Sequence, residues 1–291
     1  MSSGEAGPLV SAAWMAAHLT DPDLRIAHVS VDREIYDRAH LPGAIFVDLH
    51  VDLARPGTRP ATGSVQRQYL VPTREEVAAS LAAWGVAPGQ GIVFYDDAGL
   101  NRQAIRGYWL LRLYGFPRER VHLLDGGLTV WLAQGRPTTA EATVPKPVDV
   151  PERLHERDDS LIATAEEVLA WSREASAPGG PTRLLDVRLV EEFLGADVRA
   201  ARAGHVPGAK HRVFSDFVAP DGRLRSAPEA LAILRGTGVA PDELRATYCQ
   251  GGVRAALAWF VLHELAGLTG VRNYAGSWEE WGNRPDLPVE K

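Results

Sequence analysis

The chain contains very little sulfur: among its 291 residues there are one cysteine and two methionines. A single cysteine excludes an intrachain disulfide and any metal site built from several thiolates, so we expect no metal and a reducing compartment such as the cytoplasm. Excess positive charge is missing too, since the formal net charge is −6. The chain therefore has no general attraction to nucleic acid or to an anionic membrane, and we expect neither as a partner.

Long apolar segments are also absent. No run approaches the ~20 residues that a membrane-spanning helix needs. The N-terminal stretch MSSGEAGP has neither the basic start nor the apolar core of a secretory signal. The composition that remains, 45% hydrophobic and 23% charged, is typical of a globular protein. At this length the chain suits two domains, each large enough to bury a core of its own.

The one cysteine, Cys249, lies between a short apolar stretch at 244–248 and a stretch without glycine or proline at 253–266. This pattern predicts a strand, a tight turn and a helix. Gly251 and Gly252 allow the turn to direct several N–H groups at its centre, beside the positive end of the helix, which favours a thiolate. A lone cysteine is often only a small buried hydrophobe, but such a residue needs no glycine turn. The context therefore favours a nucleophile.

The second half of the chain repeats the first. Val86 and Asp96 are ten residues apart, as are Val239 and Cys249, and the sequence LPGA at 41–44 returns as VPGA at 206–209. A fixed spacing of this kind indicates a tandem duplication. In the first copy Asp96 stands where the second has Cys249, and a carboxylate cannot carry sulfur. Only the second copy can perform thiol chemistry.

Both halves alternate strands with helices, which predicts an α/β fold with two domains, each a parallel sheet flanked by helices on both faces. Ligands are then expected beyond the carboxyl ends of the strands, where Cys249 lies. The stretch 138–159 is rich in proline, valine and charge without a clear period. We therefore expect a non-catalytic N-terminal domain at 1–140, a linker at 141–159 and a catalytic C-terminal domain at 160–291.

These motifs, in this order and in duplicate, resemble the two-domain rhodanese family of thiosulfate and mercaptopyruvate sulfurtransferases over nearly the whole chain. The matching pieces are residues 40–44 (HLPGA), 125–127 (DGG) with Trp131, 186–188 (DVR), 204–209 (GHVPGA), 249–254 (CQGGVR) and 276–281 (GSWEEW).

The resemblance implies that Cys249 carries sulfur as a persulfide and that Arg188 binds the negative charge of a small anionic donor. It further implies that no cofactor is needed and that the acceptor is cyanide or a thiol. The anionic sulfur would be held by the loop residues that follow the cysteine, namely Gln250, Gly251, Gly252, Val253 and Arg254.

Two departures from the family pattern bear on the donor. Many members carry a second donor-binding arginine where this chain has Glu192, and many thiosulfate-using members have two basic residues where it has Gln250 and Gly251. A carboxylate donor such as mercaptopyruvate is best held by a bidentate arginine clamp, which Glu192 removes. We therefore expect thiosulfate to be the better donor, with mercaptopyruvate as the alternative.

Simpler roles stay open for several residues. Arg188 could form a surface ion pair with Glu191 or Glu192, and Arg254 could be solvated or could support the thiolate. We expect the remaining motif residues to be structural: hydrogen-bonding His40 and His205, core aromatics Trp131 and Trp281, and Asp186 bound to loop backbone or to an arginine.

Two other functions compete with sulfur transfer. A cysteine-dependent phosphatase loop of the type Cys-x5-Arg would need its arginine at position 255, which is Ala255; here Arg254 follows after four residues, so the ring is one residue too short for a phosphoryl group. A non-enzymatic persulfide carrier would share Cys249 with an enzyme. Turnover of thiosulfate and cyanide separates the carrier from the enzyme.

Overall fold

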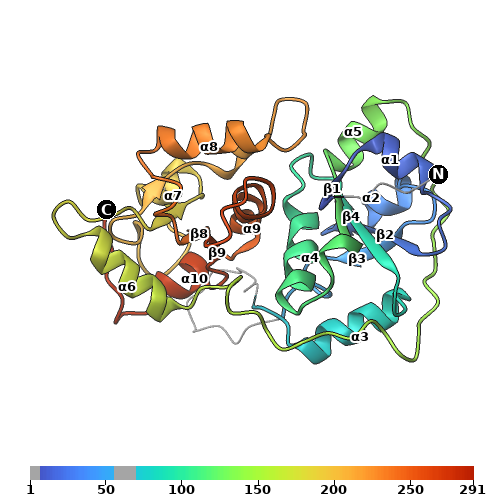
Figure 1. Ribbon diagram of the computed structural model, residues 1–291, viewed down its shortest axis with the longest axis horizontal. Helices are drawn as coiled ribbons and strands as arrows, with labels where there is room; N and C mark the ends of the chain where they lie inside the picture. Colours follow the sequence, from blue (N-terminus) through green and yellow to red (C-terminus); the bar gives the residue numbers. More distant parts are fainter. Residues whose placement is uncertain (1–6, 56–69) are drawn as a thin grey trace. The chain divides into compact units, whose positions relative to one another are not determined.

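The computed structural model of the protein describes residues 7–55 and 70–291. These residues form two compact units, drawn in Figure 1. Of the described residues, unit 1 holds 7–55, Val71–Asp158 and Ala219–Leu224, and unit 2 holds Leu70, Asp159–Val218 and Arg225–Lys291. Unit 1 is thus not contiguous in sequence, because it includes Ala219–Leu224. This segment is bound to the rest of the unit by the N–H of Leu224, which donates to the Asp125 carboxylate at 2.9 Å.

Unit 1 contains a five-stranded parallel sheet in the order β1-β5-β4-β2-β3. All six residues of β4 are buried, as the apolar run of a central parallel strand requires. The strands are β1 (Leu9–Val10), β2 (Leu24–Ser30), β3 (Ile45–Asp48), β4 (Gly91–Asp96) and β5 (Val121–Leu124).

Helices cover both faces of this sheet. On one face Met15 and Trp131 pack with Val93 in a buried cluster. On the other, Phe94 contacts the Trp84 ring, and Figure 1 shows α1 and α3 on opposite sides of the strands. The helices are α1 (Ala12–Ala17), α2 (Arg33–Arg38), α3 (Arg74–Trp84), α4 (Arg102–Leu113), the 3-10 turn η1 (Arg118–Arg120) and α5 (Gly127–Ala133).

Unit 2 repeats the plan with a four-stranded parallel sheet in the order β7-β6-β8-β9. Its strands are β6 (Leu184–Asp186), β7 (Lys210–His211), β8 (Ala246–Tyr248) and β9 (Arg272–Asn273). Its helices are α6 (Ala165–Ala175), α7 (Val190–Phe193), η2 (Phe214–Phe217), α8 (Ala227–Gly236), α9 (Val253–Trp259), the π-helical η3 (Phe260–Leu265) and α10 (Ser277–Trp281).

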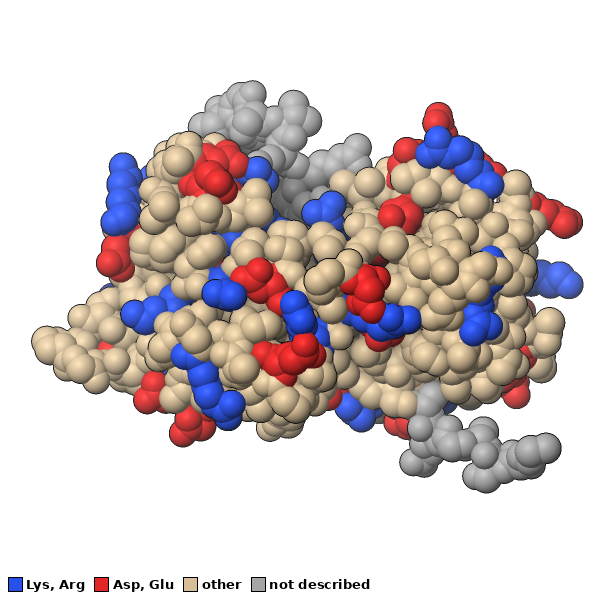
Figure 2. Space-filling model, turned by 90° about the horizontal axis from the view of Figure 1, so that it is seen from above, with Lys and Arg blue, Asp and Glu red and all other residues tan. Residues whose placement is uncertain are grey.

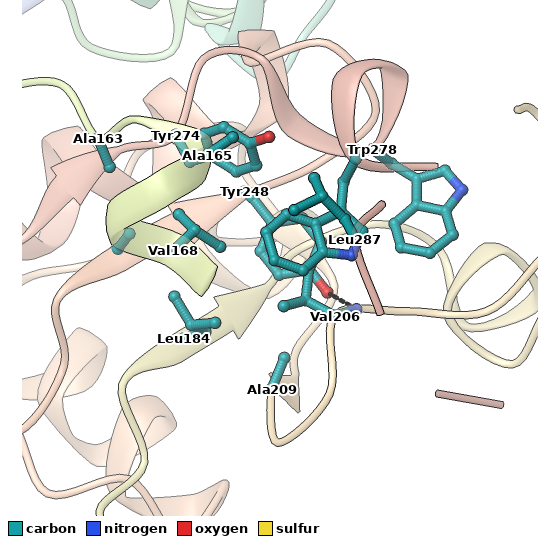
Figure 3. Packing of buried hydrophobic residues seen from close by; sticks show 12 residues of the cluster. Ala163, Ala165, Val168, Leu184, Val206, Ala209, Tyr248, Tyr274, Trp278 and Leu287 are labelled. Carbon is teal, nitrogen blue, oxygen red and sulfur yellow. Dashed lines mark hydrogen bonds between the residues drawn. The ribbon is translucent and has the colours of Figure 1, made fainter. Parts of the chain in front are cut away.

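Figure 3 shows the core on one face of this second sheet, where Tyr248 and Trp278 pack with Val168 of α6. The Tyr248 hydroxyl accepts the N–H of Val206 at 3.1 Å, so the strand before the cysteine is tied to the VPGA turn. On the other face Thr247 donates a hydrogen bond to the Ala255 carbonyl of α9 at 3.0 Å. The sheet of unit 2 is therefore also covered on both faces.

The predicted fold class is confirmed, because both sheets are parallel and carry helices on both faces. The strand expected at 244–248 is β8, and the helix expected at 253–266 is α9 continued by η3. Trp131 and Trp281 are fully buried, as expected of core aromatics, and donate to the carbonyls of Pro137 and Pro288 at 2.8 and 2.7 Å.

The domain boundaries stay a prediction. Within the stretch proposed as a linker, Val148 and His155 donate backbone hydrogen bonds to Ala82 and Tyr114 of unit 1, at 3.0 and 2.8 Å. This stretch therefore lies along unit 1 rather than standing clear of it.

Lysine and arginine side chains are interspersed with aspartate and glutamate on the face in Figure 2, with no broad field of one sign. Among the helices formed by residues 7–55 and 70–291, none combines the length and the apolar character that crossing a bilayer requires.

Candidate active site

Cys249 follows the last residue of β8 and begins the loop to α9. The chain runs from β6 outward to β7 and then returns to β8 on the other side of β6. The carboxyl ends of β6 and β8 therefore flank the point where the connections diverge, which is where parallel α/β sheets place their ligands. The structure brings Asp186 of β6, Arg188 and Cys249 to this edge; we call residues 249–254 the Cys249 loop.

The carbonyl groups of the Cys249 loop are anchored on neighbouring elements. The N–H groups of Trp278 and Glu279, in the first turn of α10, donate to the carbonyls of Cys249 and Gln250 at 2.9 and 2.8 Å. The Asn273 amide donates to the Gly252 carbonyl at 3.1 Å. Because C=O and N–H point in opposite directions across a planar trans peptide, each anchored carbonyl turns the next N–H of the loop away from its anchor.

The sulfur itself accepts another N–H of the loop: that of Gly252 lies 3.1 Å from Cys249 Sγ. Gly252 has a left-handed backbone with φ of 81°, and a Cβ at this position would lie 2.7 Å from the Ala275 carbonyl oxygen. Only glycine fits there. Cys249 is 1% exposed, so the interaction takes place in a desolvated site.

Ser277 also contacts the cysteine. Its buried hydroxyl donates to the Tyr274 carbonyl at 2.7 Å and accepts the backbone N–H of Cys249 at 3.1 Å. Its φ of 51° is rare for a residue with a side chain. Sequence reasoning missed Ser277, although the GSW motif that contains it was a signal, because the backbone conformation and the partner appear only in the folded chain.

Arg254 is held by Glu192. Both carboxylate oxygens bind the guanidinium, at 2.6 and 2.8 Å, and the Glu192 side chain is fully buried. Burial opposes the charged forms, but the pairing outweighs it and lowers the pKa of Glu192 below its ordinary value. The pKa of Arg254 is raised, against the same burial, by its hydrogen bonds to Glu192 and by its electrostatic interaction with Cys249. Arg254 is therefore not simply solvated, and Glu192 is not an unmatched negative charge facing the donor.

Arg188 lies deeper than expected. Its guanidinium is bound to the Asp186 carboxylate, with Nη2 at 2.7 Å, donates to the Gly204 carbonyl at 2.8 Å, and stacks 4.5 Å from the Trp278 ring centre. Both members of the ion pair are at most 1% exposed. The alternative of a surface pair with a neighbouring glutamate is wrong, and the expected pairing of Asp186 with an arginine is confirmed. Donor binding by Arg188 stays a prediction.

The two histidines of the Pro-Gly turns are structural, as expected. His40 Nδ1 donates to the Tyr36 carbonyl at 2.7 Å and its ring stacks on the Tyr36 ring. His205 Nδ1 donates to the Phe193 carbonyl at 3.0 Å and stacks in the same way on Phe193. Each ring fixes its turn to the preceding helix.

In unit 1 the equivalent position is occupied by Asp96. Its buried carboxylate accepts the N–H groups of Gln103 and Ala104, in the first turn of α4, at 2.8 and 3.2 Å. Burial raises the pKa of Asp96, while these hydrogen bonds act in the opposite direction. The carboxyl end of β4 therefore carries a side-chain carboxyl group of its own, held by the first turn of α4.

Within residues 7–55 and 70–291, no group of three or more histidine, cysteine, aspartate or glutamate side chains is placed to hold a metal ion. The chemistry available at the carboxyl ends of β6 and β8 is that of one sulfur that accepts a peptide N–H, together with two paired arginines, Arg188 and Arg254.

Comparison with known proteins places this site in a wider group. The family model described as a rhodanese-like domain matches the chain twice, at residues 11–134 and 164–284. A putative thiosulfate sulfurtransferase of Haloferax volcanii is 36% identical, with 97% of this chain and 96% of the relative covered. A probable 3-mercaptopyruvate sulfurtransferase of Pseudomonas aeruginosa is 38% identical over 99% of both chains.

A third relative, the sulfur carrier protein TtuD of Thermus thermophilus, is 34% identical over 97% of this chain and 96% of its own length. Among solved structures, the anaerobic ergothioneine biosynthesis enzyme of Chlorobium limicola superposes with a TM-score of 0.80 at 23% identity, covering 98% of this chain and 70% of that one. At that identity the likeness shows the fold alone.

Proposed function

The chain belongs to the rhodanese family of sulfurtransferases, with two rhodanese-like domains in tandem, and from this premise we propose that it transfers the outer sulfur of thiosulfate to cyanide or a thiol through a persulfide on Cys249. The observation that carries this proposal is the position of the sulfur: Cys249 Sγ accepts the N–H of Gly252 at 3.1 Å in a loop whose carbonyls are bound elsewhere.

In the first half-reaction the Cys249 thiolate attacks the outer sulfur of thiosulfate. The sulfur–sulfur bond of the donor breaks, and sulfite leaves with its electron pair. In the second half-reaction the acceptor attacks the terminal sulfur of the persulfide, the new sulfur–sulfur bond breaks, and the thiolate of Cys249 is restored. With cyanide as the acceptor the product is thiocyanate, and neither half-reaction requires a net proton transfer.

The loop stabilises the terminal sulfur of the persulfide, which is anionic. The N–H groups of Gln250, Gly251, Gly252 and Val253 are proposed to supply fixed dipoles for it, in the way that donors aimed at a developing charge lower a barrier. Such donors need no reorganisation: α10 and Asn273 already orient the peptide units that carry the N–H groups of Gln250, Gly251 and Val253, and the N–H of Gly252 already points at the sulfur.

Arg188 and Arg254 are proposed to contribute by position. Arg188 is buried and paired with Asp186. We therefore propose that its positive charge attracts the donor electrostatically, without direct contact. Arg254 stands one residue inside α9 and brings a positive charge beside the sulfur.

Mercaptopyruvate is the second candidate donor, and the name of the Pseudomonas aeruginosa relative, a probable 3-mercaptopyruvate sulfurtransferase, favours it. A carrier role is the third candidate, favoured by the name of the Thermus thermophilus relative. The phosphatase alternative receives no support from this site, because Arg254 is engaged by Glu192 and position 255 is a buried alanine.

The deciding experiment measures kcat/KM with cyanide for each donor and, separately, the mass of the donor-treated protein. Thiosulfate turnover that exceeds mercaptopyruvate turnover, together with a mass increase of one sulfur atom, supports the proposal. The reverse preference would refute the choice of donor. A mass increase without turnover for either donor would identify a carrier.

A further inference from the structure

The ion pair between Glu192 and Arg254 joins two elements at the Cys249 loop. Glu192 comes from α7, which follows β6, and Arg254 from α9, which follows β8. The pair is bidentate, and Glu192 Oε2 also accepts the N–H of Leu189 at 3.1 Å, which fixes the carboxylate on its own helix. A second arginine, Arg199, lies 3.8 Å from Glu192 Oε1 but is bound more closely to Asp197, at 2.6 Å.

The buried charges around the sulfur are nearly balanced before any donor arrives. Arg254 is paired with Glu192, and Arg188 is paired with Asp186. When Cys249 is a thiolate, the two carboxylates and the sulfur carry one more negative charge than the two guanidinium groups carry positive charge. An anionic donor therefore meets peptide dipoles but no surplus cation in this buried set.

We propose that Glu192 is a positioning residue that fixes Arg254 beside the sulfur and cancels its charge, so that the site attracts an anionic donor less strongly, and a dianion much less strongly, than an unpaired Arg254 would. The choice of donors named below rests on the proposed function, but the effect on charge does not. The inference also revises the argument from sequence, in which Glu192 stood in place of a donor-binding arginine: its partner is Arg254.

The size of the effect follows from Coulomb's law. Glu192→Gln keeps the shape of the side chain and removes one negative charge, which leaves the positive charge of Arg254 uncompensated. At a separation of about 8 Å and an effective dielectric constant of about 40, between the protein and bulk-water values, this favours an approaching monoanion by about fivefold. Because the energy scales with the charge of the approaching group, the same change favours a dianion by the square of that factor, about 25-fold.

The single cysteine allows this to be measured without any assumption about the reaction. Iodoacetate and iodoacetamide alkylate a thiolate with the same leaving group, but only the first is an anion. We expect Glu192→Gln to raise the ratio of the iodoacetate rate to the iodoacetamide rate by about fivefold. Glu191→Gln is the matched control, because it removes the same charge from an exposed neighbour, and it should leave the ratio unchanged.

Further variants keep the test decisive if Glu192→Gln folds poorly. Arg254→Gln should lower the ratio, although it leaves a buried carboxylate without a partner and should destabilise unit 2. The double variant Glu192→Gln with Arg254→Gln has no net change in charge and should return the ratio to the wild-type value. The proposal would be overturned if the ratio in Glu192→Gln equalled that of the wild type. It would also be overturned if the double variant and Arg254→Gln had the same ratio.

The donors provide the last arm of the experiment. In Glu192→Gln, kcat/KM should rise about 25-fold for thiosulfate and about fivefold for mercaptopyruvate, mainly through KM. Equal changes for both donors, with an unchanged alkylation ratio, would mean that Glu192 has only a structural role. Absence of turnover with both donors, combined with the expected alkylation ratio, would refute the proposed function and leave the role of Glu192 supported.

Discussion

The loop after β4 in unit 1 and the loop after β8 in unit 2 occupy equivalent positions in a duplicated fold, but the side chains that accept their N–H groups differ. In unit 1 the Asp96 carboxylate reaches the first turn of α4 and takes the N–H groups of Gln103 and Ala104. In unit 2 the shorter side chain of Cys249 accepts the N–H of Gly252, within its own loop. The protein's own carboxyl group therefore occupies the N–H groups in unit 1, whereas we propose that the loop in unit 2 holds the anionic sulfur of a donor.

The lengths of the two loops fit this difference. Asp96 is followed by six steps to the start of α4 at Arg102, and Cys249 by four to the start of α9 at Val253. The first residues of the facing helices nevertheless share a left-handed φ, since Gly127 and Ser277 have φ values of 53° and 51°. A Cβ on Gly127 would lie 2.5 Å from the Asp96 carbonyl oxygen, so only the second copy has room for a serine.

Of the variants that test this difference between the two loops, Cys249→Ser should have the largest effect on activity. A hydroxyl oxygen cannot form a persulfide, so sulfur transfer should disappear while the fold remains, because the change is small and isosteric. Thiocyanate formation and the mass of the donor-treated variant measure it. Substantial activity that remained in Cys249→Ser would rule out the proposed mechanism.

Ser277→Ala should have the next largest effect. It leaves the buried N–H of Cys249 without its acceptor, which costs about 2 kcal/mol of the free energy of unfolding. Ser277→Gly should cost less, since glycine also relieves the left-handed backbone by about 1 kcal/mol. Urea denaturation measures both variants.

Ser172→Ala is the matched control, because this buried serine of α6 donates to the Pro207 carbonyl at 2.8 Å and belongs to another part of unit 2. It should reduce stability without changing kcat, whereas Ser277→Ala should reduce both. Equal stability of Ser277→Ala and Ser277→Gly would show that the positive φ carries no strain.

A smaller effect concerns the pH dependence of unit 1. Burial raises the folded-state pKa of Asp96 above its unfolded value, so the folded state binds the proton more tightly. Its stabilising contribution is present below the unfolded value of about 3.9 and is lost as the pH rises through the folded pKa. Asp96→Asn keeps an oxygen for the N–H groups and removes this titration.

The measurement is the difference in unfolding free energy between Asp96→Asn and the wild type at several pH values. The variant should gain stability relative to the wild type as the pH increases from 4 towards 7. A difference that did not vary with pH would show that hydrogen bonds from the first turn of α4 compensate the burial fully.

The smallest effect should be that of Asp96→Ala on kcat, which we expect to change by no more than about twofold because the reacting sulfur belongs to unit 2. Steady-state kinetics with the better donor measure it. A hundredfold loss, about 2.7 kcal/mol in the barrier, would show that the loop of unit 1 takes part in catalysis.

Much of the fold could be predicted because its signals are local. The strand before Cys249, the glycine turn and the helix after it all follow from the pattern of apolar residues and glycines between 244 and 266. The duplication followed from spacing alone. In the same way, the burial of Trp131 and Trp281 and the bonding of His40 and His205 followed from their place in repeated motifs.

The sequence by itself therefore determined the α/β class, the tandem repeat, the single cysteine and the aspartate that takes its place in the first copy. Only the tertiary structure decided that Arg254 pairs with Glu192, that Arg188 is buried against Asp186, and that Ser277 accepts the N–H of Cys249. The physical reason is that a charged or polar side chain takes its partner from the groups that lose water together with it. Residues 62 positions apart, such as Glu192 and Arg254, meet only when two crossover connections place α7 and α9 at one edge of the sheet.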